Sequence, residues 1–241
     1  MDVRLLSAGD AALVVEFGDR IERGLSEAVL RLAERLRLAG VAGVVETVPT
    51  YRSLMVHYDP LRTSHEALEQ ALGGLLEDGG GGAAAPGRRW RLPACYEAPH
   101  APDLAQVAER TAMSTADVVR QHAGTEFHVY MLGFVPGYPY MGDLPEALVL
   151  PRRADPRVRV PPGSIAIAST MTAIYPVESP GGWHLIGATP VRLFDPARES
   201  PALLSPGDKV FFEPVGMARF DELRRASAAG DYLPDSERIC P

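Results

Sequence analysis

The stretch EDGGGGAAAPG, residues 77–87, divides the chain of 241 residues into two parts. Its run of four glycines, followed by three alanines and a proline, offers almost no side chain that a core could bury. Such a composition is typical of a flexible linker. We therefore predict an N-terminal domain at 1–78, a linker at 79–87 and a C-terminal domain at 88–241.

On the N-terminal side of this linker, strand and helix patterns alternate. Residues 3–18 and 41–59 each read as two short strands, rich in valine and leucine and interrupted by turn residues. Residues 26–39 and 64–76 have apolar side chains at helical spacing with charged residues between them. The order β-β-α-β-β-α predicts two helices on one face of a mainly antiparallel sheet.

On the C-terminal side the pattern begins with a strand at 88–96 and two short helices at 102–112 and 114–124. Beyond residue 125, many short β-type runs are separated by proline and glycine, which indicates a sandwich or a barrel. A last helix is expected at 219–230. The fold class predicted for the whole chain is α+β.

Several expected helices carry recognisable ends. Ser26 and Ser64 stand where the side chain of an N-terminal cap is expected, and Gly40 stands where the first helix should end. Ser114 and Asp117 have the spacing of a capping box, with aspartate in the place of the usual glutamate.

Composition and charge exclude several classes of protein. Lysine and arginine total 24 against 31 aspartates and glutamates, so the net charge of −7 argues against nucleic-acid binding. No apolar run approaches the roughly 20 residues that a membrane span needs. Acidic residues such as Asp2 and Asp10 interrupt the region where a secretion signal would be apolar. We expect a cytoplasmic protein without membrane contact.

Neither the cysteines nor the common sequence motifs predict a metal site or a P-loop. Cys95 and Cys240 lack metal-ligand spacing and are expected to be unpaired thiols, with a disulfide between them as the alternative. The sequence has no P-loop, no dinucleotide-binding glycine pattern, no zinc-protease motif and no nucleophile elbow. A metal site is therefore not predicted, and a nucleotide would not be bound by a P-loop here.

Residues 132–145, LGFVPGYPYMGDLP, form the first candidate for a functional element. Glycines and prolines constrain most of the backbone, and a long constrained loop usually packs or functions. One interpretation is a rigid rim that places Phe134, Tyr138 and Tyr140 around a small-molecule pocket. The alternative is a packed loop that covers the end of the β-structure.

Residues 151–169 contain the second candidate. On a regular strand Arg157 and Arg159 would share one face, about 7 Å apart, and could hold a carboxylate or a phosphate. The alternative is the solvated side of an edge strand. A turn follows at once, and Ser164 lies directly after it.

Residues 175–187, YPVESPGGWHLIG, form the third candidate, with a turn expected at 179–182. In a simple hairpin Glu178 would pair with Trp183 on an aromatic wall. Glu178 and His184 would then point to opposite faces, which argues against an acid–base couple unless a bulge intervenes. The alternative is an exposed hairpin with a core tryptophan.

Two histidines have simpler interpretations. His122 falls in the last turn of an expected helix, where the helix dipole favours a cation, so a capping role is expected. His128 shares a strand face with Tyr130, which favours packing over catalysis.

Four stretches taken together resemble one family. In order and spacing, residues 132–145, 151–164, 175–187 and 193–215 are similar to the KipI-like proteins. That family includes the B subunit of bacterial 5-oxoprolinase and proteins labelled allophanate hydrolase subunit one. The resemblance covers nearly the whole chain.

The resemblance implies an N-terminal ferredoxin-like α/β domain followed by a C-terminal cyclophilin-like β-barrel. It implies a subunit of an ATP-dependent complex that hydrolyses 5-oxo-L-proline to L-glutamate. The expected partners are a second cyclophilin-like protein, the KipA-like C subunit, and a lactam-utilisation A subunit. ATP would be bound by or shared with a partner, with Mg²⁺ as its counter-ion. The resemblance leaves open whether the isolated chain is active.

The sequence is also compatible with other functions. KipI-like proteins are named as inhibitors of a sensor histidine kinase, so a regulatory binding protein is one alternative. A subunit of an allophanate or urea amide hydrolase is another. Prolyl isomerisation is suggested only by the barrel, and Arg157 is the one candidate for its catalytic arginine.

The expected site follows from the resemblance and the three candidate stretches. Catalytic residues are not identified, and the candidates are His122, Arg157 and Glu178. Family members often carry polar residues where this chain has Met171 and Ala188, so the substrate could be another amide. The residues expected to bind substrate are Phe134, Pro136, Gly137, Tyr138, Tyr140, Ser164, Tyr175, Gly181, Gly182 and Trp183.

Overall fold

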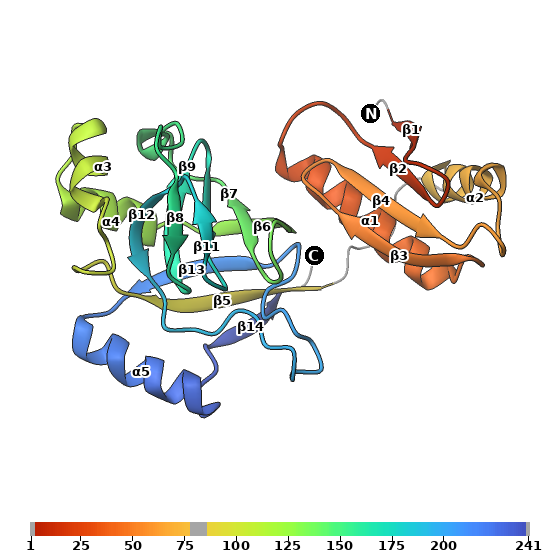
Figure 1. Ribbon diagram of the computed structural model, residues 1–241. Helices are drawn as coiled ribbons and strands as arrows, with labels where there is room; N and C mark the ends of the chain where they lie inside the picture. Colours follow the sequence, from red (N-terminus) through yellow and green to blue (C-terminus); the bar gives the residue numbers. More distant parts are fainter. Residues whose placement is uncertain (1–2, 78–85, 240–241) are drawn as a thin grey trace. The chain divides into compact units, whose positions relative to one another are not determined.

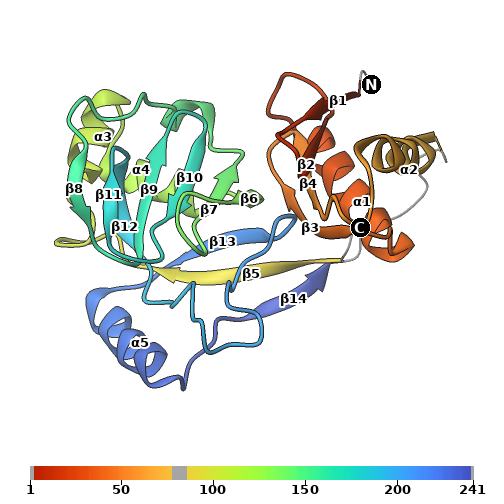
Figure 2. The same ribbon diagram turned by 45° about the vertical axis from the view of Figure 1, so that its right-hand side comes forward.

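The computed structural model describes residues 3–77 and 86–239, and these form two compact units. The first unit consists of the described residues up to Gly87 together with Ile239, and the second spans Arg88–Arg238 (Figures 1 and 2). Most of the predicted linker, residues 79–85, lies outside the described residues.

The first unit combines four antiparallel strands with two helices. The sheet order is β1-β2-β4-β3. Alternate strand residues such as Leu13, Val15 and Leu54 pack with Leu32 and Leu68 of the helices in one core. The elements are β1 (Arg4–Ser7), β2 (Ala12–Glu16), α1 (Arg23–Ala39), β3 (Val44–Pro49), β4 (Ser53–Tyr58) and α2 (His65–Glu77).

The chain order in this sheet differs from the ferredoxin-like order, β-α-β-β-α-β. The edge strand beside β2 is β1, which comes before the first helix and not after the second. The predicted element order β-β-α-β-β-α is therefore confirmed, while the ferredoxin-like connection is wrong for one strand.

The helix ends test the sequence predictions directly. Gly40 ends α1 in the left-handed region at φ 58°, as predicted. The prediction for Ser26 is wrong, because α1 begins at Arg23 and Ser26 is fully buried within the helix. Before α2, the Ser64 hydroxyl accepts a hydrogen bond from the backbone N–H of Ala67 at 3.2 Å.

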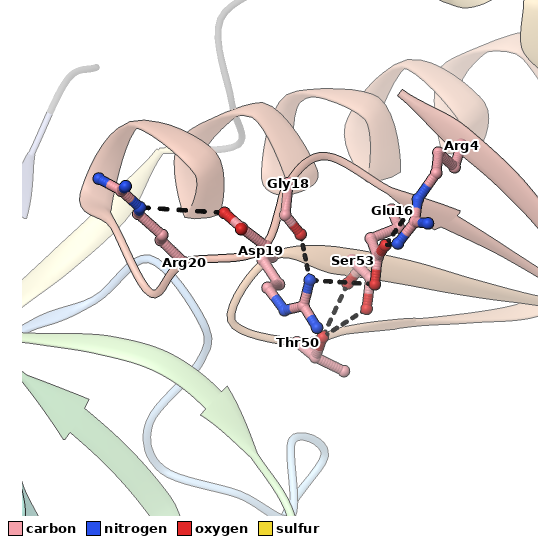
Figure 3. Close-up of polar contacts among 8 residues, drawn as sticks. Arg4, Glu16, Gly18, Asp19, Arg20, Thr50 and Ser53 are labelled. Atoms are coloured by element: carbon pink, nitrogen blue, oxygen red, sulfur yellow. Dashed lines mark hydrogen bonds and ion pairs between the residues drawn. The ribbon is translucent and has the colours of Figure 1, made fainter. Parts of the chain in front are cut away.

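A carboxylate on β2 is held between two arginines (Figure 3). Arg4 Nε donates to Glu16 Oε1 at 3.0 Å, and Arg52 Nη1 lies 3.0 Å from Glu16 Oε2. The Arg4 hydrogen bond holds the pKa of Glu16 below its usual value. Arg52 also donates to the carbonyl oxygen of Gly18. These contacts join β1, β2 and the turn before β4.

The second unit is built on a larger sheet with the order β12-β9-β10-β7-β6-β13-β5-β14. The β5–β13 pair is parallel, and β8 and β11 form a separate two-stranded ribbon. The elements are β5 (Gly87–Ala94), α3 (Leu104–Arg110), α4 (Thr115–Ala123), β6 (Phe127–Leu132), β7 (Pro139–Gly142), η1 (Glu146–Leu148), β8 (Arg157–Val160), β9 (Ser164–Ala168), β10 (Met171–Ile174), β11 (Ser179–Gly181), β12 (His184–Ala188), β13 (Lys209–Pro214), α5 (Met217–Ala229) and β14 (Ser236–Ile239).

Most predicted elements of this unit are present, so the chain is a mixed α+β protein. The capping box at α4 is confirmed, because Ser114 Oγ accepts from Asp117 N–H at 3.1 Å and Ser114 N–H donates to the Asp117 carboxylate. The core of the unit joins the large sheet to α3 and α4 through residues such as Leu92, Val107 and Val118.

The expected barrel is not seen as a closed ring of paired strands among the described residues. The sheet has two ends, β12 and β14. A single bridge links Cys95, just after β5, to Ala188 at the end of β12, with N–H···O distances of 2.8 and 2.9 Å. This bridge connects β12, at one edge of the sheet, to the residue that follows β5, the seventh strand in the order. Within residues 86–239, the two strands share only this one pair of residues and do not close the sheet into a barrel.

Two smaller predictions concern cysteine and the membrane. Cys95 is a buried free thiol, and Cys240 lies outside the described residues. In the ranges 3–77 and 86–239, no helix has both the length and the apolar character that crossing a bilayer requires.

Candidate functional site

A hollow of about 250 Å³ opens in the second unit, between the 134–140 loop, residues 152–156 and the 175–183 segment. Most of the residues expected to bind substrate lie at this hollow, together with three that were not predicted. Its lining consists of Phe134, Tyr138, Tyr140, Arg152, Pro156, Tyr175, Pro180, Gly181, Gly182 and Trp183.

The rim begins in the tight connection between β6 and β7. Gly133 N–H donates to the carbonyl of Tyr138 at 3.1 Å, and Tyr138 N–H donates to the carbonyl of Val135 at 3.1 Å. Phe134 has φ 68°, an uncommon conformation for a bulky residue that persists where the surroundings enforce it. Phe134 is 60% exposed and lies at the edge of the hollow.

Tyr138 is the centre of the aromatic wall. Its ring centroid lies 5.5 Å from Phe134, 5.0 Å from Tyr140, 5.1 Å from Tyr175 and 6.4 Å from Trp183. Most of these pairs are edge-to-face, the arrangement that the ring quadrupoles favour. Tyr138 is only 2% exposed, so its buried ring restrains the positions of the neighbouring rings that line the hollow.

Glycine is required at position 181, beside Tyr175 in the lining of the hollow. A Cβ atom at Gly181 would overlap with the Tyr175 hydroxyl, so the phenol packs directly on the backbone of β11. Burial raises the pKa of Tyr175, and a hydrogen bond from the Tyr138 hydroxyl opposes part of that rise. Burial also raises the pKa of Tyr140, so Tyr140 and Tyr175 are both neutral phenols near pH 7.

Arg152 is the cation of the hollow, and the sequence analysis missed it. Its guanidinium carbon lies 6.0 Å from the ring centroid of Trp183. Its charge also opposes the rise in the pKa of Tyr140 and of Tyr175. The available signal was its place in PRRADP, where Pro151 and Pro156 bracket two arginines.

The predicted pair of arginines on β8 is wrong. Arg157 Nη2 donates to Asp103 Oδ1 at 2.6 Å, whereas Arg159 is exposed and lies 3.5 Å from Glu178 Oε1. Ser179 pairs with Val160 and Gly181 with Arg157, so β8 has one residue more than β11 between these pairs. This bulge turns Arg157 inward while Arg159 stays in solvent.

The carboxylate of Asp103 accepts hydrogen bonds from several residues near the hollow. Arg153 Nη1 donates to Asp103 Oδ1 at 2.9 Å, and Leu185 N–H donates to Oδ2 at 2.7 Å. Arg153 N–H also donates to the carbonyl of Gly182 at 2.8 Å. Arg157 is therefore a structural partner of Asp103 and does not line the hollow.

The predicted hairpin at 175–187 is also wrong. β11 pairs with β8, and β12 pairs with β9, so the two halves of the segment do not pair with each other. Glu178 forms its ion pair with Arg159 and lies outside the hollow. His184 is buried, and its Nε2 donates to the carbonyl of Pro151 at 3.0 Å. The two residues form no acid–base couple, as expected, although the hairpin on which that expectation rested is absent.

His122 is not a charged helix cap. It is fully buried, and burial lowers its pKa to about 3, so the ring is neutral. The Thr172 hydroxyl donates to the Ala166 carbonyl, so it accepts from His122 Nε2 at 2.9 Å. Nδ1 then accepts from the Tyr96 hydroxyl at 2.8 Å. The histidine links α4 to the sheet and does not line the hollow.

The remaining predicted residues lie elsewhere in the unit. Pro136 and Gly137 line a separate, open depression formed by residues 132–137. Ser164 lines a separate cavity of about 450 Å³. His128 packs edge-to-face on Tyr130, with ring centroids 4.6 Å apart, as predicted. Nowhere in the described part of the chain do three histidine, cysteine or carboxylate side chains gather to hold a metal ion.

Comparison with known proteins identifies the family to which the sequence is similar. The family described as "Carboxyltransferase domain, subdomain C and D" matches residues 3–204. The B subunit of 5-oxoprolinase from Escherichia coli O157:H7 is 40% identical over 208 residues, which are 86% of this chain and 93% of that protein. The corresponding protein of Bacillus subtilis (strain 168) is 34% identical over 218 residues, covering 85% of this chain and 89% of that protein.

A solved structure agrees with these matches. The crystal structure of TTHA0988 has a TM-score of 0.76 and 37% identity over 85% of this chain. The chain spans only 40% of the length of that protein. By its match over residues 3–204 and its identity to both bacterial relatives, this chain belongs to the carboxyltransferase subdomain C and D family, alongside the B subunits of 5-oxoprolinase.

Proposed function

We propose that this chain is the B subunit of an ATP-dependent 5-oxoprolinase and that its aromatic hollow receives the lactam ring of 5-oxo-L-proline. The observation that carries the proposal is the hollow itself, in a chain 40% identical to a protein named as the B subunit of 5-oxoprolinase. Its volume of about 250 Å³ suits a single small ring. Drug-sized ligands usually occupy about 300–1,000 Å³.

The lining of the hollow supports a binding role without a nucleophile of its own. Among the lining residues that the structure describes, none is a serine, cysteine, histidine or carboxylate. Opening a five-membered lactam requires activation of its amide oxygen, for which the reaction consumes ATP. The chain would hold and orient the ring while groups of a partner subunit complete the site.

ATP, with Mg²⁺ as its counter-ion, belongs in this proposal to a partner or to a site shared with one. The hollow holds one arginine and no carboxylate that could bind Mg²⁺. We place the chain in a cytoplasmic complex with a second cyclophilin-like C subunit and a lactam-utilisation A subunit. The likeness of the second unit to a cyclophilin-like barrel, and the domain limits 1–78 and 88–241, are part of the same proposal.

The direct test is reconstitution with the two proteins proposed as partners. The complete complex should release ADP and glutamate only when 5-oxo-L-proline and ATP are both present, and omission of this chain should abolish the release. ADP release with allophanate in place of 5-oxo-L-proline would favour the amide hydrolase alternative. Binding to a histidine kinase, without any substrate-dependent ADP release, would favour the regulatory alternative.

A further inference from the structure

We infer that Arg152 is the specificity-determining residue of the hollow, and that it selects small cyclic molecules that carry a carboxylate. The carboxylate would lie on the guanidinium of Arg152, and the ring would lie against Trp183 and Tyr140. This inference rests on the proposed function, because it names the group of the lactam substrate that the hollow recognises.

The neighbouring arginines differ in their partners. Arg153 and Arg157 both bind Asp103, at 2.9 and 2.6 Å, and Arg159 lies 3.5 Å from Glu178. Arg152 lines the hollow, and in the described portion of the chain no carboxylate lies within ion-pair distance of it. Three of the four arginines between 152 and 159 are therefore paired within the protein, and the one at the hollow remains available to a ligand.

The guanidinium of Arg152 lies beside an aromatic ring. Its carbon lies 6.0 Å from the centroid of the Trp183 ring, within the range of a cation–π contact. Such a contact restrains the long side chain and leaves its N–H groups able to bind an anion. A guanidinium binds a carboxylate through two parallel N–H···O bonds, a geometry that a lysine cannot reproduce.

The other lining residues of the hollow are neutral. Tyr140 and Tyr175 are protonated phenols, so no negative charge competes with a bound anion. Trp183 and Tyr140 have ring centroids 6.1 Å apart and both line the hollow, so their rings supply apolar surface to it. A flat ring with one carboxylate matches this combination of apolar wall, phenol donors and a single cation.

The test compares two ligands that differ only in the carboxylate. The full-length chain is titrated calorimetrically with 5-oxo-L-proline and with 2-pyrrolidinone, which has the same ring without the carboxylate. We expect at least tenfold tighter binding of 5-oxo-L-proline. Arg152→Gln should reduce its affinity about 10- to 100-fold and leave that of 2-pyrrolidinone unchanged. Arg152→Lys should recover only part of the loss.

Arg159→Gln is the matched control, because Arg159 lies on the adjacent strand and its guanidinium pairs with Glu178 outside the hollow. It should preserve the preference for the carboxylate. Equal affinities for the two ligands in the unmodified chain would overturn the inference. So would a preference that survives Arg152→Gln, or one that Arg159→Gln removes to the same extent.

The reconstituted complex gives a second measurement, which decides the question if the isolated chain binds neither ligand. Arg152→Gln should raise the KM for 5-oxo-L-proline at least tenfold and change kcat much less, since the interaction is made in the bound ground state as well. An unchanged KM would contradict the inference alone. Absence of 5-oxoproline-dependent ADP release by the unmodified complex would instead contradict the proposed function.

Discussion

The surroundings of Asp103 and the aromatic hollow lie in the same unit, and their polar groups meet different partners. The Asp103 carboxylate accepts from Arg153, Arg157 and the backbone N–H of Leu185. At the hollow, the guanidinium of Arg152 lies over the Trp183 ring and its charge acts on Tyr140 and Tyr175, and among the described residues no carboxylate pairs with it. Paired buried charges stabilise the fold when their partners are complete, whereas a charge left open at a cavity is available for a ligand.

The largest expected effect comes from Asp103→Ala, which breaks the paired region. Both arginines and the Leu185 N–H would lose their acceptor in a largely buried site, and Asp103 itself is only 4% exposed. Removing one partner of a buried ion pair costs about 3–5 kcal/mol. We expect that loss in the free energy of unfolding measured by urea denaturation. Asp155→Ala, at an exposed position, is the control, and a loss below about 1 kcal/mol for Asp103→Ala would contradict the structural role.

The second effect is a pH dependence of stability that arises from His122. Its folded pKa of about 3 lies below the usual value of 6.5, so the unfolded state binds the proton first as the pH falls. His122 therefore contributes stability above pH 6.5 that is lost progressively toward pH 3. The loss between pH 7 and pH 5 should be about 2 kcal/mol.

The readout for His122 is the slope of the unfolding free energy against pH. His122→Gln lowers stability at every pH, but its slope between pH 5 and pH 7 should be smaller than that of the unmodified chain. Equal slopes for the two proteins would show that His122 binds its proton equally well in the folded and unfolded states, which would contradict the lowered pKa.

A third variant, Gly181→Ala, tests the packing of Tyr175 at the wall of the hollow. The new Cβ would overlap with the Tyr175 hydroxyl, so Tyr175 must move. We expect a loss of about 1–3 kcal/mol in stability together with weaker binding of 5-oxo-L-proline. Gly182→Ala is the matched control, because its nearest atoms, in Pro156, are at an ordinary 3.6 Å. Similar losses for both variants would argue against a specific packing of Tyr175.

The smallest effect on the fold is expected from Phe134→Ala. Phe134 is 60% exposed, so its removal should change the unfolding free energy by less than about 0.5 kcal/mol. Its loss from the rim should weaken ligand binding about two- to tenfold. Val158→Ala, which truncates an 85% exposed side chain on β8, should change neither quantity. A destabilisation comparable to that of Gly181→Ala would make Phe134 part of the core.

Local patterns predicted the elements well, because their signals lie in adjacent residues. The end of α1 at Gly40 and the capping box at Ser114 depend on residues within one turn, and both are as expected. The aromatic stretches could also be recognised, since the constrained backbone and the rings occur together in the sequence. Their meeting at one hollow is a tertiary result.

The errors share a physical cause, which is pairing between distant segments. The 175–187 hairpin is absent because β11 and β12 each pair with a strand that precedes them in the chain. Arg157 turns inward because of a bulge that single-strand alternation does not indicate. Arg152 was not selected because its importance depends on Trp183, which lies 31 positions later in the sequence.

The early position of β1 has a consequence for how the chain acquires its structure during synthesis. Every strand of the first sheet precedes Glu77, so that sheet can be completed while the rest of the polypeptide is still being translated. The second sheet must wait, because β5 is paired in parallel with β13, some 120 residues later. Ribosome-bound nascent chains should therefore become protease-resistant in two steps, the first well before the second.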